Sequence, residues 1–98
     1  MSIRIAFPAQ FAELTGGAGS VTVEATTVGE ALARLTERYP ALASYVWPRG
    51  ASGVGGRAEL NPVIVVFLNG EDVRHRGGLA AALRDGDELT VISAVEGG

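Results

Sequence analysis

Alternating hydrophobic and polar residues near the start of the chain predict two strands. Residues 2–8 have the period-two pattern of a strand with one buried face, and Pro8 ends it because proline donates no hydrogen bond to a ladder. The large apolar side chains on the buried side are Ile3, Ile5 and Phe7. Residues 20–25 alternate in the same way, and the glycine-rich stretch 15–19 predicts a turn. We therefore expect a hairpin with a long connection.

The clearest helix signal covers residues 27–39. Thr27 and Glu30 have the spacing of a capping box, in which the hydroxyl accepts from the Glu30 amide and the Glu30 carboxylate reaches back. Pro40 ends the helix because it disfavours helical geometry in the residue before it. Apolar residues recur at helical spacing along one face. They are Val28, Ala31, Leu32, Leu35 and Tyr39.

The second half of the chain predicts further strands around short turns. Residues 62–68 form a nearly continuous apolar run, and Asn69-Gly70 is a strong hairpin signal. Residues 71–73 predict a short strand, 79–83 one or two helical turns, and 89–93 the last strand. Strands and helix are segregated, which predicts an α+β fold. A mixed sheet of four to five strands over one main helix, a β-grasp, is the most economical arrangement.

Length and charge limit the classes of function. The chain has 98 residues, enough for one domain spanning 1–98, and a net charge of −3. Nucleic-acid binding is disfavoured because it requires a basic surface. The sequence contains neither a signal-peptide pattern nor a run of about 20 apolar residues. We expect a cytoplasmic protein that is monomeric when free and contacts no membrane.

Two residue types are absent, and each absence restricts the chemistry. Without cysteine there is no thiolate nucleophile, zinc–thiolate site or persulfide. All eight basic residues are arginine, so no lysine side chain can receive an isopeptide bond. The most common reason for such a bias is genome composition, but the chemical consequence is the same.

Internal candidates for catalysis are weak. His75 stands between two arginines and has no sequence-evident catalytic partner, so we interpret it as a surface residue. Asp85, Asp87 and Glu88 lack the full spacing of a calcium loop and are expected to cap a turn. The glycine-rich stretch 49–60 lacks a P-loop ending and is interpreted as a flexible surface loop. We predict no metal site.

The terminal glycines are the remaining candidate. Gly-Gly at a chain end is often only a frayed segment. Here Gly97 and Gly98 follow closely on the last predicted strand, and an extended tail from Ser93 to Gly98 would span roughly 20 Å at ~3.3–3.6 Å per residue. Glycine suits a narrow channel because it has no Cβ. A flexible tail, 94–98, could therefore place the Gly98 carboxylate inside a partner enzyme.

In order and spacing, several stretches together resemble the MoaD/ThiS family of ubiquitin-like sulfur carriers. They are residues 7–16 (FPAQFAELTG), the helix 27–39 with Pro40, 67–73 (FLNGEDV), 85–89 (DGDEL) and 97–98 (GG). Within the family, the second half looks closest to the carriers used in cysteine synthesis. Its matching stretches are 67–74, 77–83, 85–87 and 94–98.

The resemblance implies a ubiquitin-like β-grasp and a protein cosubstrate that is not itself an enzyme. An E1-like adenylyltransferase and sulfurtransferase would join the Gly98 carboxylate to AMP, using ATP and Mg²⁺, and sulfide would then give a thiocarboxylate. The chain itself would bind no cofactor. In the cysteine route, the sulfur acceptor is a PLP-dependent synthase and a zinc metalloprotease releases cysteine, so both are expected partners.

The resemblance also implies an apolar partner-binding patch on the outer face of the sheet, beside the tail. On the body we expect Phe7, Val63, Val65 and Val91 to form it, and in the tail Ala94, Val95, Glu96 and Gly97.

Three other functions stay open at this point. The chain could be the small subunit of molybdopterin synthase, or a carrier for a sulfur-containing secondary metabolite. It could also be a β-grasp binding module or protein modifier whose glycine end is inert or forms isopeptides.

Overall fold

The structure is a computed structural model that describes residues 1–47, 60–61 and 63–93. Within these residues five strands form one mixed sheet in the order β2-β1-β5-β3-β4. The strands are β1 (Ser2–Ala6), β2 (Ser20–Glu24), β3 (Ile64–Leu68), β4 (Glu71–Asp72) and β5 (Glu88–Ser93). The helices are α1 (Val28–Arg38) and α2 (Ala43–Val46), with 3₁₀ turns η1 (Ala9–Leu14), η2 (Pro40–Leu42), η3 (Val73–His75) and η4 (Gly78–Ala80). The predicted β-grasp is confirmed.

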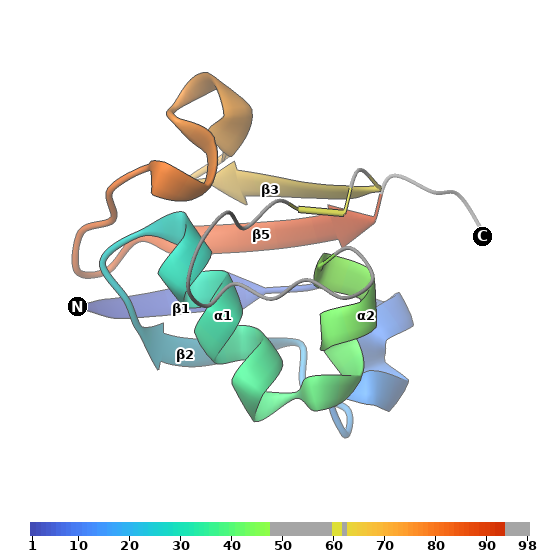
Figure 1. Ribbon diagram of the computed structural model, residues 1–98. Coiled ribbons are helices and arrows are strands. Elements are labelled where there is room, and N and C mark those ends of the chain that lie inside the picture. Colours follow the sequence, from blue (N-terminus) through green and yellow to red (C-terminus); the bar gives the residue numbers. More distant parts are fainter. Residues whose placement is uncertain (48–59, 62, 94–98) are drawn as a thin grey trace.

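The last strand lies inside the sheet. β5 pairs parallel with β1 and antiparallel with β3, while β1 also pairs antiparallel with β2. Figure 1 shows α1 and α2 on one side of this sheet, and β5 running between its two neighbours. β5 is therefore paired with β1 as far as Thr90 and with β3 as far as Ser93, its last residue.

One continuous core lies between the sheet and the helices. The sheet contributes its alternate side chains, and α1 contributes the predicted apolar face. The core residues of these elements include Ile3, Ile5, Val21, Val23, Leu32, Leu35, Ile64, Val66, Leu89 and Val91. Trp47 follows α2 and belongs to the same core, where it is 2% exposed. Its Nε1–H donates to Thr36 Oγ1 at 3.1 Å. Because the indole nitrogen is paired, the burial of this large ring leaves no polar atom unsatisfied.

The capping box at the start of α1 is confirmed with one change. The Glu30 amide donates to Thr27 Oγ1 at 3.2 Å, as expected. The Glu30 carboxylate reaches one residue further back than in the standard box, where Oε1 accepts from the Thr26 amide at 2.7 Å and from the Thr26 hydroxyl at 3.0 Å. These bonds, the backbone one first, lower the pKa of Glu30.

Replacing Thr27 by Ala is expected to destabilise the fold by about 1 kcal/mol, because one amide in the first turn of α1 loses its partner. The measurement is urea unfolding monitored by circular dichroism. The matched control is Thr27→Ser, which keeps the hydroxyl and should stay close to the parent. Equal stability of the two variants would contradict the capping role.

The turn after β3 follows the sequence prediction, whereas the stretch after residue 78 does not. Asn69 and Gly70 have φ of 50° and 90°, the left-handed pair that a two-residue hairpin requires. The prediction of a helix over 79–83 was wrong. A single 3₁₀ turn covers Gly78–Ala80, and residues 81–83 are not helical. The next residues are extended against the start of α1: the Val28 amide donates to the Ala81 carbonyl at 3.1 Å, and the Leu83 amide donates to that of Thr26 at 2.9 Å. These bonds outcompete a helix of four or five residues.

Candidate partner-binding surface

The outer face of the sheet, away from α1, has an apolar strip. The register places Val65 opposite Ile92 and Phe67 opposite Thr90, and Ala6 of β1 lies beside Thr90. Directly opposite residues point to the same side of a sheet, so these five residues form one surface, which we call the outer strip. Ile92 is 38% exposed, and Val65 and Phe67 are half-buried.

Ion pairs border the outer strip on two sides. On β1 and β5, Arg4 Nη1 lies 2.8 Å from Glu88 Oε2. At the β4 edge, Asp72 lies opposite Phe67 and receives Arg74 Nη2 at 2.6 Å and Nε at 3.1 Å. The Arg74 side chain, and then its backbone amide, lower the pKa of Asp72 to about 2. An apolar centre with a charged rim is the usual composition of a protein–protein interface.

Two residues of the predicted patch were assigned to the wrong face. Phe7 is 7% exposed and Val91 is fully buried, and both belong to the core. The physical reason is the pleat. Phe7 has the parity of Ile3 and Ile5, and Val91 has that of Leu89, so each points towards the helices.

The rest of the predicted patch divides into three groups. Val65 is on the outer strip, as predicted. Val63 is half-buried and packs against the core. The tail residues lie outside the described residues, as does 48–59, most of the predicted glycine-rich loop; the tail residues are Ala94, Val95, Glu96, Gly97 and Gly98.

Sequence reasoning missed Phe67 and Ile92. Strict alternation over 88–93 would have found Ile92, because Glu88 and Thr90 are polar and share its parity. Phe67 had no such signal, since every residue from 63 to 68 is apolar and the run shows no alternation.

Of the internal candidates, His75 is a surface residue, and Asp85 and Asp87 have structural roles. His75 is exposed at the end of η3, as predicted for a surface residue. Asp87 caps the turn before β5 as expected, since its Oδ2 accepts from the Arg84 amide at 2.8 Å. Asp85 Oδ1 accepts from the Ser2 amide at 2.7 Å, which ties this turn to the start of β1.

Buried polar side chains and possible metal-ligand groups are scarce in the described part of the chain. The only polar residue buried there is Thr15, whose hydroxyl bonds to neighbouring backbone carbonyls. Within residues 1–47, 60–61 and 63–93, no group of three or more His, Cys, Asp or Glu side chains could hold a metal ion. No helix among these residues is both long and apolar enough to cross a membrane.

Comparisons with known proteins cover the whole chain. The ThiS family model matches residues 5–98. The sulfur carrier protein CysO of Mycobacterium tuberculosis is 32% identical over 98 residues, which is 100% of each chain. The small archaeal modifier protein 3 of Haloferax volcanii is 33% identical over 100 residues, again covering 100% of both.

Solved structures show the same fold. The small archaeal modifier protein 1 of Methanosarcina acetivorans has a TM-score of 0.85 and 28% identity, covering 99% of this chain and 96% of its own. A chain of the Amycolatopsis orientalis BexX/CysO complex has a TM-score of 0.81 and 32% identity, covering 98% and 99%. With the ubiquitin-like β-grasp topology and matches along its whole length, this chain belongs to the ThiS family.

Proposed function

We propose that this chain is a sulfur carrier of the CysO type, which transports sulfur as a thiocarboxylate on Gly98. The observation that supports this most directly is the end-to-end match to a sulfur carrier protein, together with a family match that extends to residue 98. The absence of cysteine from the sequence supports the same conclusion, because no thiol is available to hold sulfur.

The reaction that we propose uses a partner enzyme for activation. A carboxylate oxygen is a poor leaving group, so an E1-like enzyme joins the Gly98 carboxylate to the AMP part of ATP. Pyrophosphate leaves, and Mg²⁺ assists as the ion bound to the nucleotide. Sulfide then attacks the acyl carbon; a C–S bond forms, the C–O bond to AMP breaks, and AMP leaves. The resulting thiocarboxylate sulfur is a better nucleophile than the original oxygen. In this proposal Gly98 is a substrate, and the chain is not a catalyst.

The body of the fold serves as the handle in this scheme. Binding energy from contacts remote from the reacting atoms can be used to hold the tail in position, which is how proximity increases the rate of a reaction. The outer strip is the surface that we propose for this docking. Its apolar centre and charged border suit a partner enzyme, and one of the similar solved chains comes from a complex of CysO with BexX.

Cysteine is the product that we propose for the pathway, by similarity to CysO. In that route the partners are a PLP-dependent synthase that accepts the sulfur and a zinc metalloprotease that restores Gly98, all in the cytoplasm. Carriers for molybdopterin or for a secondary metabolite would use the same Gly98 chemistry with a different acceptor.

Activation can be tested by intact mass spectrometry. The chain is incubated with an activating enzyme encoded near its gene, ATP, Mg²⁺ and sulfide. We expect a mass increase equal to the difference between sulfur and oxygen, confined to the C-terminal peptide. A reaction without ATP is the control and should leave the mass unchanged. Failure to gain sulfur with an enzyme that adenylates Gly98 would refute the carrier function.

A protein modifier is the second candidate, favoured by the small archaeal modifier proteins among the similar chains. In that case the activated Gly98 acyl group would be transferred to a lysine of another protein. Accumulation of higher-mass conjugates in place of the thiocarboxylate would identify this function. The sequence has no lysine, so the side chains of one copy could not receive the Gly98 acyl group of a second copy, and polymers of this protein could not form in that way.

A further inference from the structure

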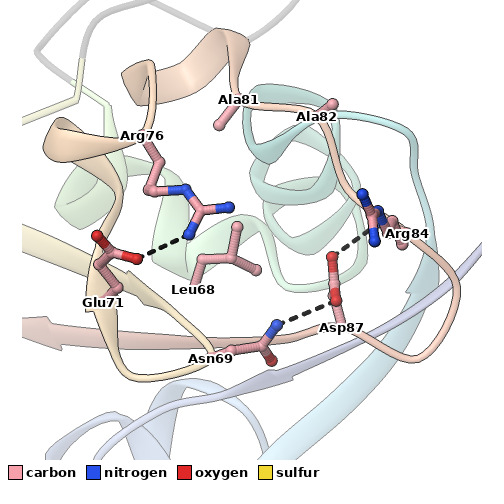
Figure 2. A pocket seen from close by; sticks show the side chains of 8 residues that line it. All are labelled: Leu68, Asn69, Glu71, Arg76, Ala81, Ala82, Arg84 and Asp87. Atoms are coloured by element: carbon pink, nitrogen blue, oxygen red, sulfur yellow. Dashed lines mark hydrogen bonds and ion pairs between the residues drawn. The ribbon is translucent and has the colours of Figure 1, made fainter.

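A pocket of about 420 Å³ lies at the end of the sheet that is distant from Ser93. It is between the β3–β4 turn and the start of β5. Figure 2 shows Arg76 on one side of it and Arg84 on the other, with Leu68 between them. None of these residues belongs to the outer strip, and the function proposed above does not use the pocket.

Most of the hydrogen-bond acceptors at this pocket are already engaged. Asp87 Oδ1 accepts from Asn69 Nδ2 at 3.0 Å, and Oδ2 accepts from the Arg84 amide at 2.8 Å. These bonds, the backbone one first, lower the pKa of Asp87. Asn69 Oδ1 accepts from the Glu88 amide at 3.0 Å. The carboxylate of Glu71 accepts from Arg76 Nη1 at 2.7 Å through Oε1.

The guanidinium groups at this pocket still have hydrogen-bond donors available for a ligand. A guanidinium has five N–H donors, and Arg76 spends one nitrogen, Nη1, on Glu71. The Arg84 guanidinium makes no hydrogen bond or close ion pair with any residue in the described ranges 1–47, 60–61 and 63–93, although its charge attracts the nearby Asp87 carboxylate. Two guanidinium groups with free donors therefore line one pocket, and the complementary ligand group is an oxyanion.

The pocket also has an apolar part and room for more than an oxyanion. Leu68 and Ala81, which are 5% and 6% exposed, give a small apolar area to a lining that is otherwise mostly polar. Its volume is within the range of about 300–1,000 Å³ that is usual for small-ligand sites. The ligand that satisfies both features has a carboxylate on a short hydrocarbon chain.

We infer that the pocket between Arg76 and Arg84 binds an organic carboxylate of this kind. A free dicarboxylate and the acidic side chain of a partner protein share this chemistry. The inference does not depend on the sulfur-carrier proposal, because its test uses the free chain and involves no sulfur.

The test is a ¹H–¹⁵N NMR titration at constant ionic strength with three probes: glutarate, an acetylated Glu-Glu dipeptide amide and inorganic phosphate. We expect saturable shifts at Asn69, the Arg84 side-chain Nε–H and the Gly86 amide, with glutarate or the peptide binding more tightly than phosphate. Tighter binding of the peptide than of glutarate identifies a protein side chain as the source, and the reverse order identifies a small molecule.

Three variants separate this site from general attraction of anions. Arg84→Gln should weaken binding by about tenfold, because it removes a charge-assisted contact. Glu71→Gln should strengthen binding a few-fold, since it removes a negative charge and releases Arg76. Arg38→Gln, at the exposed end of α1, is the matched control and should bind like the parent.

Several outcomes would overturn the inference. One is a set of shifts that does not saturate with any of the three probes or that spreads over all the arginines. Another is equal binding by the parent and Arg84→Gln, with both folded as judged by their amide spectra. Tighter binding of phosphate than of either carboxylate would also overturn it, because the apolar side of the pocket would then have no role.

Discussion

Deletion of Gly98 is expected to abolish sulfur loading of the chain while leaving its fold intact. The new terminal carboxylate, on Gly97, would end about 3.3–3.6 Å short of the position that the activating enzyme provides for the acyl carbon. A displacement of even 1 Å from a reactive geometry can reduce a rate by about 100-fold, so we expect a loss of at least that size. The readout is the rate of ATP-dependent thiocarboxylate formation by intact mass spectrometry.

The control for this deletion is His75→Ala, which changes an exposed side chain on η3 and should load at the parental rate. The thermal midpoint of the deletion variant should match that of the parent, because no core residue is removed. Normal loading of the shortened chain would show that Gly98 is not the sulfur-bearing residue, and would refute the proposed mechanism even if the chain is a carrier.

A charge at the centre of the outer strip is expected to disrupt partner binding. Ile92→Glu would place a carboxylate beside Val65, where docking removes water, and the unpaired charge would oppose binding. The cost at a central interface residue is about 2 kcal/mol or more, which is roughly a 30-fold loss of affinity for the activating enzyme. Affinity can be measured by isothermal titration calorimetry.

Thr22→Glu is the matched control for Ile92→Glu. Thr22 is also exposed on the outer face but lies on β2, opposite Arg4, so it is at the charged border of the strip and outside its apolar centre. Both variants add one carboxylate to a strand, so both should lose a similar, small amount of stability. Equal affinity of the two variants for the enzyme would show that docking uses another surface.

Local patterns predicted the fold well wherever one signal determined one element. The Thr27–Glu30 cap and Pro40 bracket α1 closely, since the helix runs from Val28 to Arg38. The Asn69-Gly70 turn and the alternation in β1 were equally clear. Each of these signals acts over a few neighbouring residues, which is why the sequence alone reveals it.

Errors arose where tertiary contacts decide the outcome. The helix expected over 79–83 is replaced mostly by extended backbone that pairs with Thr26 and Val28, residues distant in sequence. The outer strip joins residues of β1, β3 and β5, so the strand order had to be known before it could be assembled. The pocket between Arg76 and Arg84 could not be predicted for the same reason.

The position of β5 also has a mechanical consequence. β1 and β5 are adjacent and parallel, so they point in the same direction although they begin and end the described chain. A pull on the two ends would slide these strands past each other, and the hydrogen bonds between them would be loaded together instead of opening one after another. A force applied between the two ends of the described chain would therefore meet the combined resistance of these hydrogen bonds.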